Sequence, residues 1–425
     1  MTAALPKALS IESFQPPPTE APIKTARKDG GRAARDKADS LIDEALATIR
    51  DHFGMPVAYL SRFEGDKTVF RNVSAPGLED MIKPGDAQKL ADVYCPHIVS
   101  GALPHLIPDT RHEKLCQDMP ITHNLPIGSH VSLPIYNEDD SIYGMFCCLA
   151  PVPKPSLNPR DLAVMASFAN LANRQVLIQE ELTRKSDATR ARIERVLSSS
   201  DFYAVYQPLV RLRDRRVIGY EALSRFTAPE KMTPDIWFLD AADVGLGIDL
   251  ELATLKAALD GLTALPQGTY LSINASPDLI SDPQFIELLK MHPVKRLLLE
   301  ISELSDAQDN AAFHRGVQEI KRLGLRIAID DVGAGYSGLQ RIALLQPDML
   351  KIDRALAQEI DLNITHRAIV SALVHFAQET GTQVLVEGVE RPEEAAALRV
   401  LGVNFAQGWH FGKPGPINDF TKQVS

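Results

Sequence analysis

The chain has 425 residues, a length that predicts two domains, because a single hydrophobic core rarely grows that large. Its 55 acidic and 45 basic residues give a net charge of -10, which argues against partners such as nucleic acid polymers and anionic membranes. Four cysteines are too few for a disulfide framework, and no apolar run is long enough for membrane insertion, so we expect a cytoplasmic protein.

The first 35 residues predict a disordered segment. They combine the proline-rich stretch Pro16–Pro22 with a stretch rich in lysine, arginine and glycine, and they offer little surface to bury. A first domain is expected over residues 36–175, opening with an amphipathic helix at 38–52. Four strands are expected to follow, at 57–63, 69–73, 130–136 and 142–149.

A long helix is predicted from Arg160 to Leu197, and residues 176–200 are assigned as the connection to a second domain. Its apolar residues recur at helical spacing: Leu162, Met165, Ala169 and Val176. Such a stripe either packs on its own domain or pairs with the same stripe of a second copy in a parallel coiled coil. We expect the pairing, and therefore a homodimer.

Residues 201–425 form the second predicted domain, in which short apolar runs end in a carboxylate or an amide. The runs are Tyr270–Asn274, Arg296–Glu300, Arg326–Asp330, Met349–Asp353 and Gln383–Glu387. Runs of this kind predict strands buried on both faces of a parallel sheet, and helix-like stretches at 307–323 and 365–380 lie between them. The alternation predicts repeated βα units, which can close into a barrel.

Acidic and amide side chains at these strand ends would meet at one end of such a barrel, where barrel enzymes hold their active sites. Carboxylates brought so close repel one another and raise each other's pKa. Divalent cations relieve that repulsion, so the pattern predicts a metal site. Asp353 is the exception, because its place at a strand end suits the N-cap of a helix.

Eight segments, in order, resemble the EAL family of cyclic di-GMP phosphodiesterases over residues 201–416. They are YQPLV from Tyr206, GYEALSRF from Gly219, LSIN from Leu271, LLLEISE from Leu297, IAIDDVGAGYSGL from Ile327, PDMLKID from Pro347, VLVEGVE from Val384 and AQGWHFGKP from Ala406. The resemblance implies an α/β fold with a TIM-like (β/α)8 barrel. It also implies an enzyme that opens cyclic di-GMP to linear pGpG.

The family resemblance further implies two divalent ions, Mg²⁺ or Mn²⁺, in the active site. Hard ions of this kind take oxygen ligands, and a pair of them can activate a water and clamp a phosphate. The first ion would be held by Glu221, Asn274, Glu300 and Asp330. Asp330 would bridge to a second ion that is also held by Asp331 and Glu387.

Lys351 matches the catalytic lysine of the family, and Glu387 and Glu390 match further catalytic positions. Because side chains alternate along a strand, Leu350 and Ile352 would face the surrounding helices and Lys351 would point into the barrel. There it would orient the attacking water. The substrate-binding positions are matched by Gln207, Arg225 and Gln407, and Glu303 resembles a glutamate that anchors the loop after Asp331.

One loop departs from the family pattern. The usual DDFGTGYSSL stands here as DDVGAGYSGL, so that Val332, Ala334 and Gly338 replace a phenylalanine, a threonine and a serine. The family uses this segment to couple dimer contacts to the active site, so the changes bear on rate and regulation. No segment resembles GGDEF, which argues against the opposing cyclase activity.

Residues 36–175 resemble an α+β GAF sensor domain. The segments that carry this resemblance are DVYCPHIVSGALPHLIPDTR from Asp92, IGSHVSLPIY from Ile127 and SIYGMFCCLAP from Ser141. GAF domains bind many ligands or none, so the ligand stays open. The spacing of its cysteines and histidines fits no zinc motif, and Pro96 after Cys95 argues against a bilin. Cys147 and Cys148 are expected in the core, with redox sensing as an alternative.

These observations predict a cytoplasmic phosphodiesterase whose barrel is regulated by a GAF-like sensor. The alternative is a barrel that binds cyclic di-GMP with little turnover and signals through partner contacts. A third reading is an unrelated metal-dependent barrel that abstracts a proton next to a carboxylate.

Overall fold

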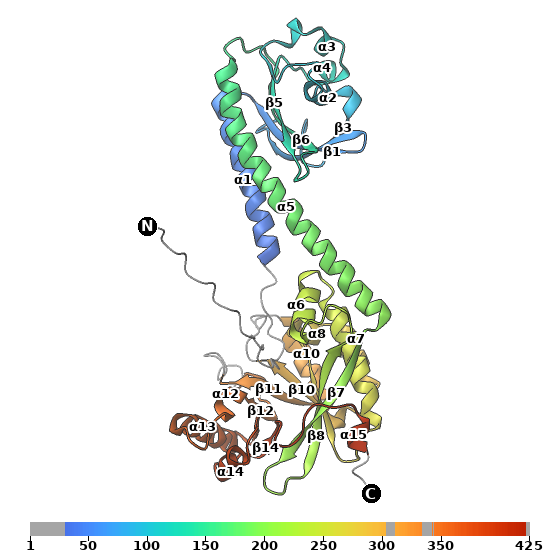
Figure 1. Ribbon diagram of the computed structural model, residues 1–425, viewed down its shortest axis with the longest axis vertical. Helices are drawn as coiled ribbons and strands as arrows, with labels where there is room; N and C mark the ends of the chain where they lie inside the picture. The colour runs from blue at the N-terminus through green and yellow to red at the C-terminus, as the bar shows by residue number, and fades with distance from the viewer. Residues whose placement is uncertain (1–29, 303–310, 334–341, 343, 422–425) are drawn as a thin grey trace, which may run out of the picture. The chain divides into compact units, whose positions relative to one another are not determined.

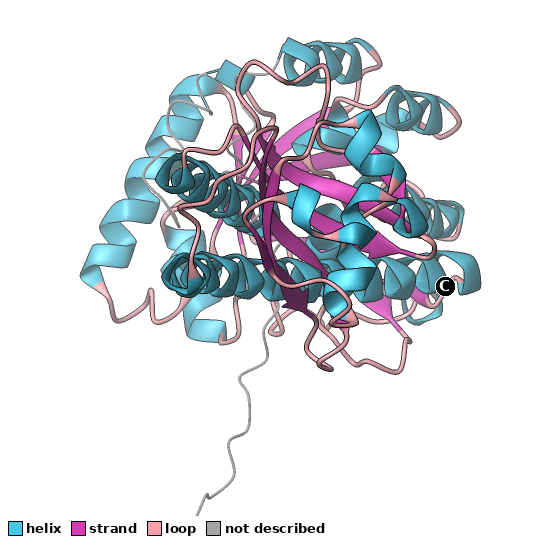
Figure 2. Ribbon diagram, turned by 90° about the horizontal axis from the view of Figure 1, so that it is seen from above, coloured by secondary structure: helices cyan, strands magenta, loops and turns pink. Residues whose placement is uncertain are grey.

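The computed structural model describes residues 30–302, 311–333, 342 and 344–421. Its contacts divide the chain into two compact units, of which the first ends at Asp187 and the second begins at Ala188. Both units combine helices and strands (Figures 1 and 2). Among the described helices, none has the length and apolar character needed to cross a lipid bilayer.

The first unit is built on a six-stranded antiparallel sheet with the order β3-β2-β1-β6-β5-β4. The strands are β1 (Val57–Glu64), β2 (Lys67–Ser74), β3 (Ala87–Lys89), β4 (Leu106–Ile107), β5 (Ser129–Tyr136) and β6 (Ile142–Ala150). The four strands predicted from the sequence are confirmed as β1, β2, β5 and β6. The two edge strands escaped prediction because two or three residues are too few to show an alternating pattern.

Helices cover both faces of this sheet (Figure 1). One face packs against α1 (Gly30–Phe53) and α5 (Pro159–Ser199), and the other packs against the short helices α2 (Cys95–Val99), α3 (Lys114–Gln117) and α4 (Pro120–Asn124). Helix α1 begins at Gly30, eight residues before the predicted helix. The prediction of disorder is therefore wrong for residues 30–35, and residues 1–29 lie outside the described part.

All four cysteines are buried and free of disulfide bonds. Because neighbours on a strand point to opposite faces, Cys147 and Cys148 of β6 enter the clusters on the two sides of the sheet. The prediction that they are core residues is confirmed. Burial raises the pKa of the Cys147 and Cys148 thiols and raises that of Cys116 to about 11, so these three thiols are weak nucleophiles.

His130 of β5 is a buried titratable group in this first unit, only 2% exposed. Its ring meets that of Tyr94 edge-on at 5.4 Å, and no hydrogen-bond partner of its Nδ1 is found among the described residues. Burial lowers the pKa of His130 from 6.5 to about 4, so the folded domain keeps the imidazole neutral.

This burial predicts that the first unit loses stability in mild acid. As the pH falls from 6.5 toward 4, the unfolded chain binds a proton that the folded domain does not bind. The free energy of unfolding should therefore fall by about 3 kcal/mol across that window. Urea denaturation at several pH values, with hydrogen exchange in β5 and β6 as the probe, measures this fall in the free energy of unfolding. His130→Gln should abolish it, and equal acid sensitivity in both proteins would contradict the explanation.

The predicted dimer seam on α5 is already covered within the first unit. Met165, Ala169 and Val176 pack with Ile42 and Leu46 of α1 in one buried cluster, and Leu162 is partly buried against the same cluster. The prediction that this stripe pairs with a second copy is therefore wrong. Helical periodicity identified the buried face correctly, but not the segment that buries it.

The second unit is a closed barrel of eight strands with the order β10-β11-β12-β13-β14-β7-β8-β9. The strands are β7 (Phe202–Arg211), β8 (Val217–Phe226), β9 (Tyr270–Asn274), β10 (Leu297–Ser302), β11 (Arg326–Val332), β12 (Met349–Ile352), β13 (Gln383–Val386) and β14 (Phe405–Ala406). Strands β8 to β14 run parallel, whereas β7 is antiparallel to both of its neighbours. The predicted TIM-like barrel is confirmed, with its first strand reversed in a β7–β8 hairpin.

Helices surround this barrel and cover its outer surface (Figure 1). They are α6 (Pro234–Asp243), α7 (Gly247–Asp260), α8 (Pro277–Ile280), α9 (Pro283–Lys290), α10 (Ala311–Arg322), α12 (Arg354–Ala357), α13 (Ile364–Thr380), α14 (Pro392–Val400) and α15 (Asn418–Thr421). The large cluster between strands and helices contains Leu350 and Ile352, and a smaller cluster that includes Tyr270, Leu298 and Met349 gathers residues from many of the strands.

The last turns of α5 belong to the second unit. Ile193 and Val196 are fully buried and pack with Trp237 and Phe238 of α6. Ion pairs from Arg192 and Arg195 to Asp240 and Glu230 accompany this contact. One continuous helix therefore contributes to the cores of both units.

Candidate active site

Polar side chains from the barrel strands and from the segments that follow them gather at the end of the barrel where the parallel strands finish, here called the barrel mouth. A cavity of about 380 Å³ opens there. Its wall includes Gln207 of β7, Glu221 and Arg225 of β8, Asn274 of β9, Asp330 of β11, and Glu387, Glu390 and Gln407 from the segments after β13 and β14. The structure thus brings together most of the predicted site residues.

Lys351 lies at the centre of this group and is fully buried. Its Nζ lies 2.5 Å from Glu387, 2.7 Å from Glu300, 3.2 Å from Asp330 and 3.7 Å from Glu221. Burial alone would lower the pKa of Lys351, but the surrounding carboxylates raise it well above its usual value. The ammonium therefore stays charged and acts as a hydrogen-bond donor rather than a base.

The carboxylates around Lys351 carry more charge than one ammonium can balance, since four acids face one base. Burial is the largest cause that raises the pKa of these acids, and repulsion from neighbouring carboxylates adds to it. The pKa of Glu300 and that of Glu387 lie well above the usual range, and that of Asp330 is also raised. When all four are ionised, three negative charges remain uncompensated. A site of this kind gains from binding cations.

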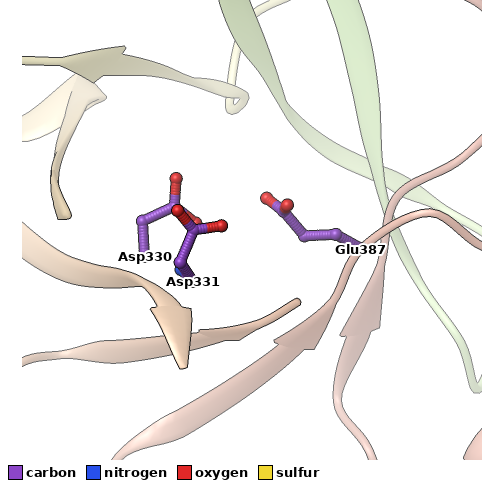
Figure 3. A group of neighbouring side chains, drawn as sticks. All are labelled: Asp330, Asp331 and Glu387. Atoms are coloured by element: carbon purple, nitrogen blue, oxygen red, sulfur yellow. The ribbon is translucent and has the colours of Figure 1, made fainter. Parts of the chain in front are cut away.

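Asp330 and Asp331 face the same side although they are neighbours on one strand. Asp331 has a φ of 59°, and the pairing of β11 with β12 shifts between Ile329 and Val332. This irregularity breaks the usual alternation of side chains. One carboxylate oxygen from each of Asp330, Asp331 and Glu387 consequently lies within 4.8 Å of the other two. Figure 3 shows the carboxylate of Glu387 pointing toward the two aspartates. Strand β11 continues through both aspartates to Val332, two residues beyond the predicted run that ends at Asp330.

Amide side chains hold the carboxylate of Glu221. Asn274 donates to one of its oxygens at 3.2 Å, and Gln407 donates to the other. Gln407 also donates to Gln207 at 2.7 Å, and Gln207 is the direct cross-strand neighbour of Glu221. Burial alone would raise the pKa of Glu221, but Lys351 and these amides lower it. Glu221 is thus the acid in the group that stays ionised most readily.

Three residues at the site were missed in the sequence. Ser272 is fully buried and donates to Glu300 at 2.5 Å. It precedes Asn274 by two positions on β9, so strand alternation alone places both on one face. Arg354 and Trp409 also line the cavity, the first at the start of α12 and the second in the segment after β14. No periodic pattern marks them, because both lie outside strands.

Other predicted residues have peripheral or structural places. Arg225 donates to the carbonyl of Ser224 at 2.9 Å. The amide of the exposed Glu390 donates to Glu394 at 3.0 Å. Asp353 accepts a bond from the amide of Ala355 at 2.8 Å, which confirms it as the N-cap of α12.

The unusual loop after Asp331 is described only at its start. Val332 is 4% exposed and packs in the cluster between the barrel strands and the helices. Ala334, Gly338 and the predicted loop anchor Glu303 lie outside the described residues.

Comparison with known families agrees with this architecture. The EAL domain model matches residues 190–414, which is more than half of the chain, and the GAF domain model matches residues 38–176. The protein belongs to the EAL domain family and carries a GAF domain before its barrel.

Individual relatives cover mainly the barrel. The chain is 34% identical to Rv1357c of Mycobacterium tuberculosis over 261 residues, which are 56% of this chain and 83% of that protein. It is 30% identical to RocR, a cyclic di-GMP phosphodiesterase of Pseudomonas aeruginosa, over 55% of this chain and 63% of RocR. The solved structure of the EAL enzyme Bd1971 with cAMP and cyclic di-GMP superposes with a TM-score of 0.55 at 20% identity, covering 87% of this chain and 93% of that one. At that identity the likeness shows the fold alone.

Proposed function

We propose that this protein is a cytoplasmic phosphodiesterase that hydrolyses cyclic di-GMP to linear pGpG with two divalent ions. The observation that carries the proposal is the fully buried Lys351 within 4 Å of four carboxylates, at the mouth of a barrel that also holds Asp331 and Asn274. The related RocR, named as a cyclic di-GMP phosphodiesterase, supports the choice of substrate.

The donor set fits hard ions such as Mg²⁺ or Mn²⁺, because every candidate ligand offers an oxygen. Glu221, Asn274, Glu300 and Asp330 would hold the first ion. Asp330, Asp331 and Glu387, whose oxygens already lie within 4.8 Å of one another, would hold the second. When bound, such ions would neutralise charge on the phosphate and lower the pKa of a bound water.

The protein's own groups would bind and orient the reactants. Lys351 would donate a hydrogen bond to the attacking water and to the negative charge that develops on the phosphate oxygens. Gln407 and Asn274 fix the carboxylate of Glu221, and Ser272 fixes that of Glu300. Because these groups are already bonded to one another, they need little rearrangement when the reaction begins.

The cavity wall supplies groups suited to a cyclic dinucleotide. Arg225 and Arg354 are cations on this wall and would contact the phosphates. Trp409, 39% exposed, also lines the cavity, where its ring would stack on a base. Gln207 would add an amide contact beside Gln407, with Glu390 at the exposed edge.

Purified full-length protein incubated with cyclic di-GMP and either Mg²⁺ or Mn²⁺ tests this function, with the products separated by chromatography. We expect linear pGpG with either metal and none in EDTA. Tight binding without product would instead identify a cyclic di-GMP receptor. If the protein neither binds cyclic di-GMP nor forms product, the substrate assignment is wrong.

We propose that the GAF domain regulates the barrel through α5. The support is a short chain of contacts inside the second unit. Ile193 and Val196 of α5 pack in one cluster with Phe238, and Phe238 also lines the cavity at the barrel mouth. A shift or rotation of α5 would therefore alter one wall of the substrate cavity, which gives the two sites a shared element.

A truncated chain that begins at Ala188 tests this coupling. It keeps Ile193 and Val196, whereas the boundary at Asp201 predicted from the sequence would remove them and uncover Trp237. We expect the truncated chain to fold and to hydrolyse cyclic di-GMP with a kcat that differs from that of the full-length protein. Identical kcat values would show that the helix merely tethers the two units.

We also propose a homodimer that uses a different face of α5 from the one first expected. Leu171 and Ile178 are 38% and 47% exposed and lie seven residues apart, the repeat of a coiled coil. Ile178→Glu should convert dimers to monomers in sedimentation velocity, because it places a charge in the apolar seam. Thr183→Glu, a matched change at an exposed position, should leave the dimer intact. A dimer that survives Ile178→Glu would refute this seam.

A further inference from the structure

The end of the barrel opposite the mouth, here called the barrel floor, contains a second and strongly basic hollow. Tyr270, Arg326 and Gln383, the first residues of β9, β11 and β13, line this hollow of about 760 Å³. Its lining includes six cationic side chains and no carboxylate: Arg211, Arg213, Lys295, Arg296, Arg326 and Arg399. Such a concentration is unexpected in a chain with a net charge of -10.

Only some of these cationic side chains are paired with other groups of the protein. Arg296 donates to the backbone carbonyls of Thr269, Leu265 and Pro266 at 3.0 to 3.3 Å, which is a structural role. Arg211 and Arg213 share one carboxylate, that of Asp214, at 3.4 and 3.7 Å. Among the residues that the structure describes, no carboxylate forms an ion pair with Lys295, Arg326 or Arg399.

Arg326 is positioned without the use of its hydrogen-bond donors. Its guanidinium carbon lies 4.6 Å from the centre of the Tyr270 ring, and Tyr270 is only 6% exposed. Stacking on a buried ring orients a guanidinium while its N–H groups stay available at the edge. Within the described part of the chain, no group accepts a hydrogen bond from the guanidinium of Arg326. The floor therefore presents an oriented donor together with Lys295 and Arg399.

We propose that the barrel floor is a binding site for a small molecule with two or more phosphate groups, of the pyrophosphate or nucleoside diphosphate class. Several cations around one hollow repel one another, and a single monovalent anion would leave most of their charge unbalanced. Phosphate groups match the donors of arginine in geometry and in charge. The overall negative charge disfavours a nucleic acid polymer, whose phosphates would extend beyond the hollow. This site is distinct from the barrel mouth and goes beyond the proposed phosphodiesterase activity.

Isothermal titration of full-length protein with pyrophosphate and with ADP tests the proposal. EDTA is present throughout, so that the carboxylates at the mouth repel the anions and only the floor binds them. The test variant is Lys295→Glu with Arg399→Glu, since both side chains are exposed and the fold should tolerate the change. Its control is Lys83→Glu with Arg315→Glu, which alters the net charge equally at exposed positions outside the floor. Arg326→Gln provides a second test of the oriented donor.

We expect saturable binding of one ligand per chain, weakened by added salt, in wild type and in the control. Both floor variants should bind at least ~10-fold more weakly, the loss expected when charge-assisted hydrogen bonds to an anion are removed. Absence of saturable binding in wild type would overturn the proposal, as would equal affinities in the floor and control variants. Tighter binding of an oligonucleotide than of pyrophosphate would overturn the assigned ligand class.

Discussion

Lys351→Met should lower kcat for cyclic di-GMP by at least ~100-fold while KM changes little, because the lost hydrogen bond strengthens mainly as charge develops in the transition state. The lysine is fully buried, and its Nζ contacts the candidate metal ligands Glu300 and Glu387. Steady-state kinetics with saturating Mn²⁺ measures both constants. A variant with normal kcat and weakened binding would make Lys351 a phosphate clamp instead.

The same substitution should destabilise the metal-free protein. Without the ammonium, Glu300, Asp330 and Glu387 would be left as buried acids with no cation, a change that typically costs ~3–5 kcal/mol. Divalent ions should recover much of that loss. Lys321→Met is the matched control, because Lys321 donates to the backbone carbonyls of Leu345 and Gln346 and lies outside the cavity. It should leave kcat and the metal dependence of stability unchanged.

Glu221→Gln should reduce turnover by at least ~100-fold and raise the Mn²⁺ concentration needed for half-maximal activity, since it removes the charge of a first-ion ligand without changing its size. Glu221 is the acid whose pKa is lowered by Lys351 and the neighbouring amides against the effect of burial, so its charge is available at neutral pH. A metal titration of activity measures both effects.

The control for this substitution is Glu319→Gln, a partly exposed acid on α10 that pairs with Arg322. It should behave as wild type in both rate and metal requirement. Activity in Glu221→Gln close to that of wild type would remove Glu221 from the metal site and with it the proposed ligand set.

The barrel and its mouth were largely predictable because burial leaves a strong mark on short strands. The run Tyr270–Asn274 is short and largely buried and ends in an amide, and it forms β9 with the predicted bounds. The direction of Lys351 followed from its neighbours Leu350 and Ile352, which pack among the outer core residues. In both cases a local rule, alternation along a strand, decided the result.

The features that escaped prediction depend on contacts between distant segments. An apolar strand has the same pattern in either direction, so the reversal of β7 could not be seen. The positive φ of Asp331 is uncommon even for aspartate, so the sequence does not mark this position as the one where strand alternation breaks. Similarly, the stripe on α5 marked a buried face, while the choice between α1 and a second copy depends on tertiary packing.

Hydrolysis of cyclic di-GMP in water enriched with ¹⁸O tests the central claim most directly. With full-length protein and Mn²⁺, we expect linear pGpG carrying one ¹⁸O in its terminal phosphate, because an activated water attacks the phosphorus. The label should be absent in EDTA and strongly reduced in Glu221→Gln. Failure of the wild-type protein with Mn²⁺ to form labelled pGpG would contradict the proposed reaction.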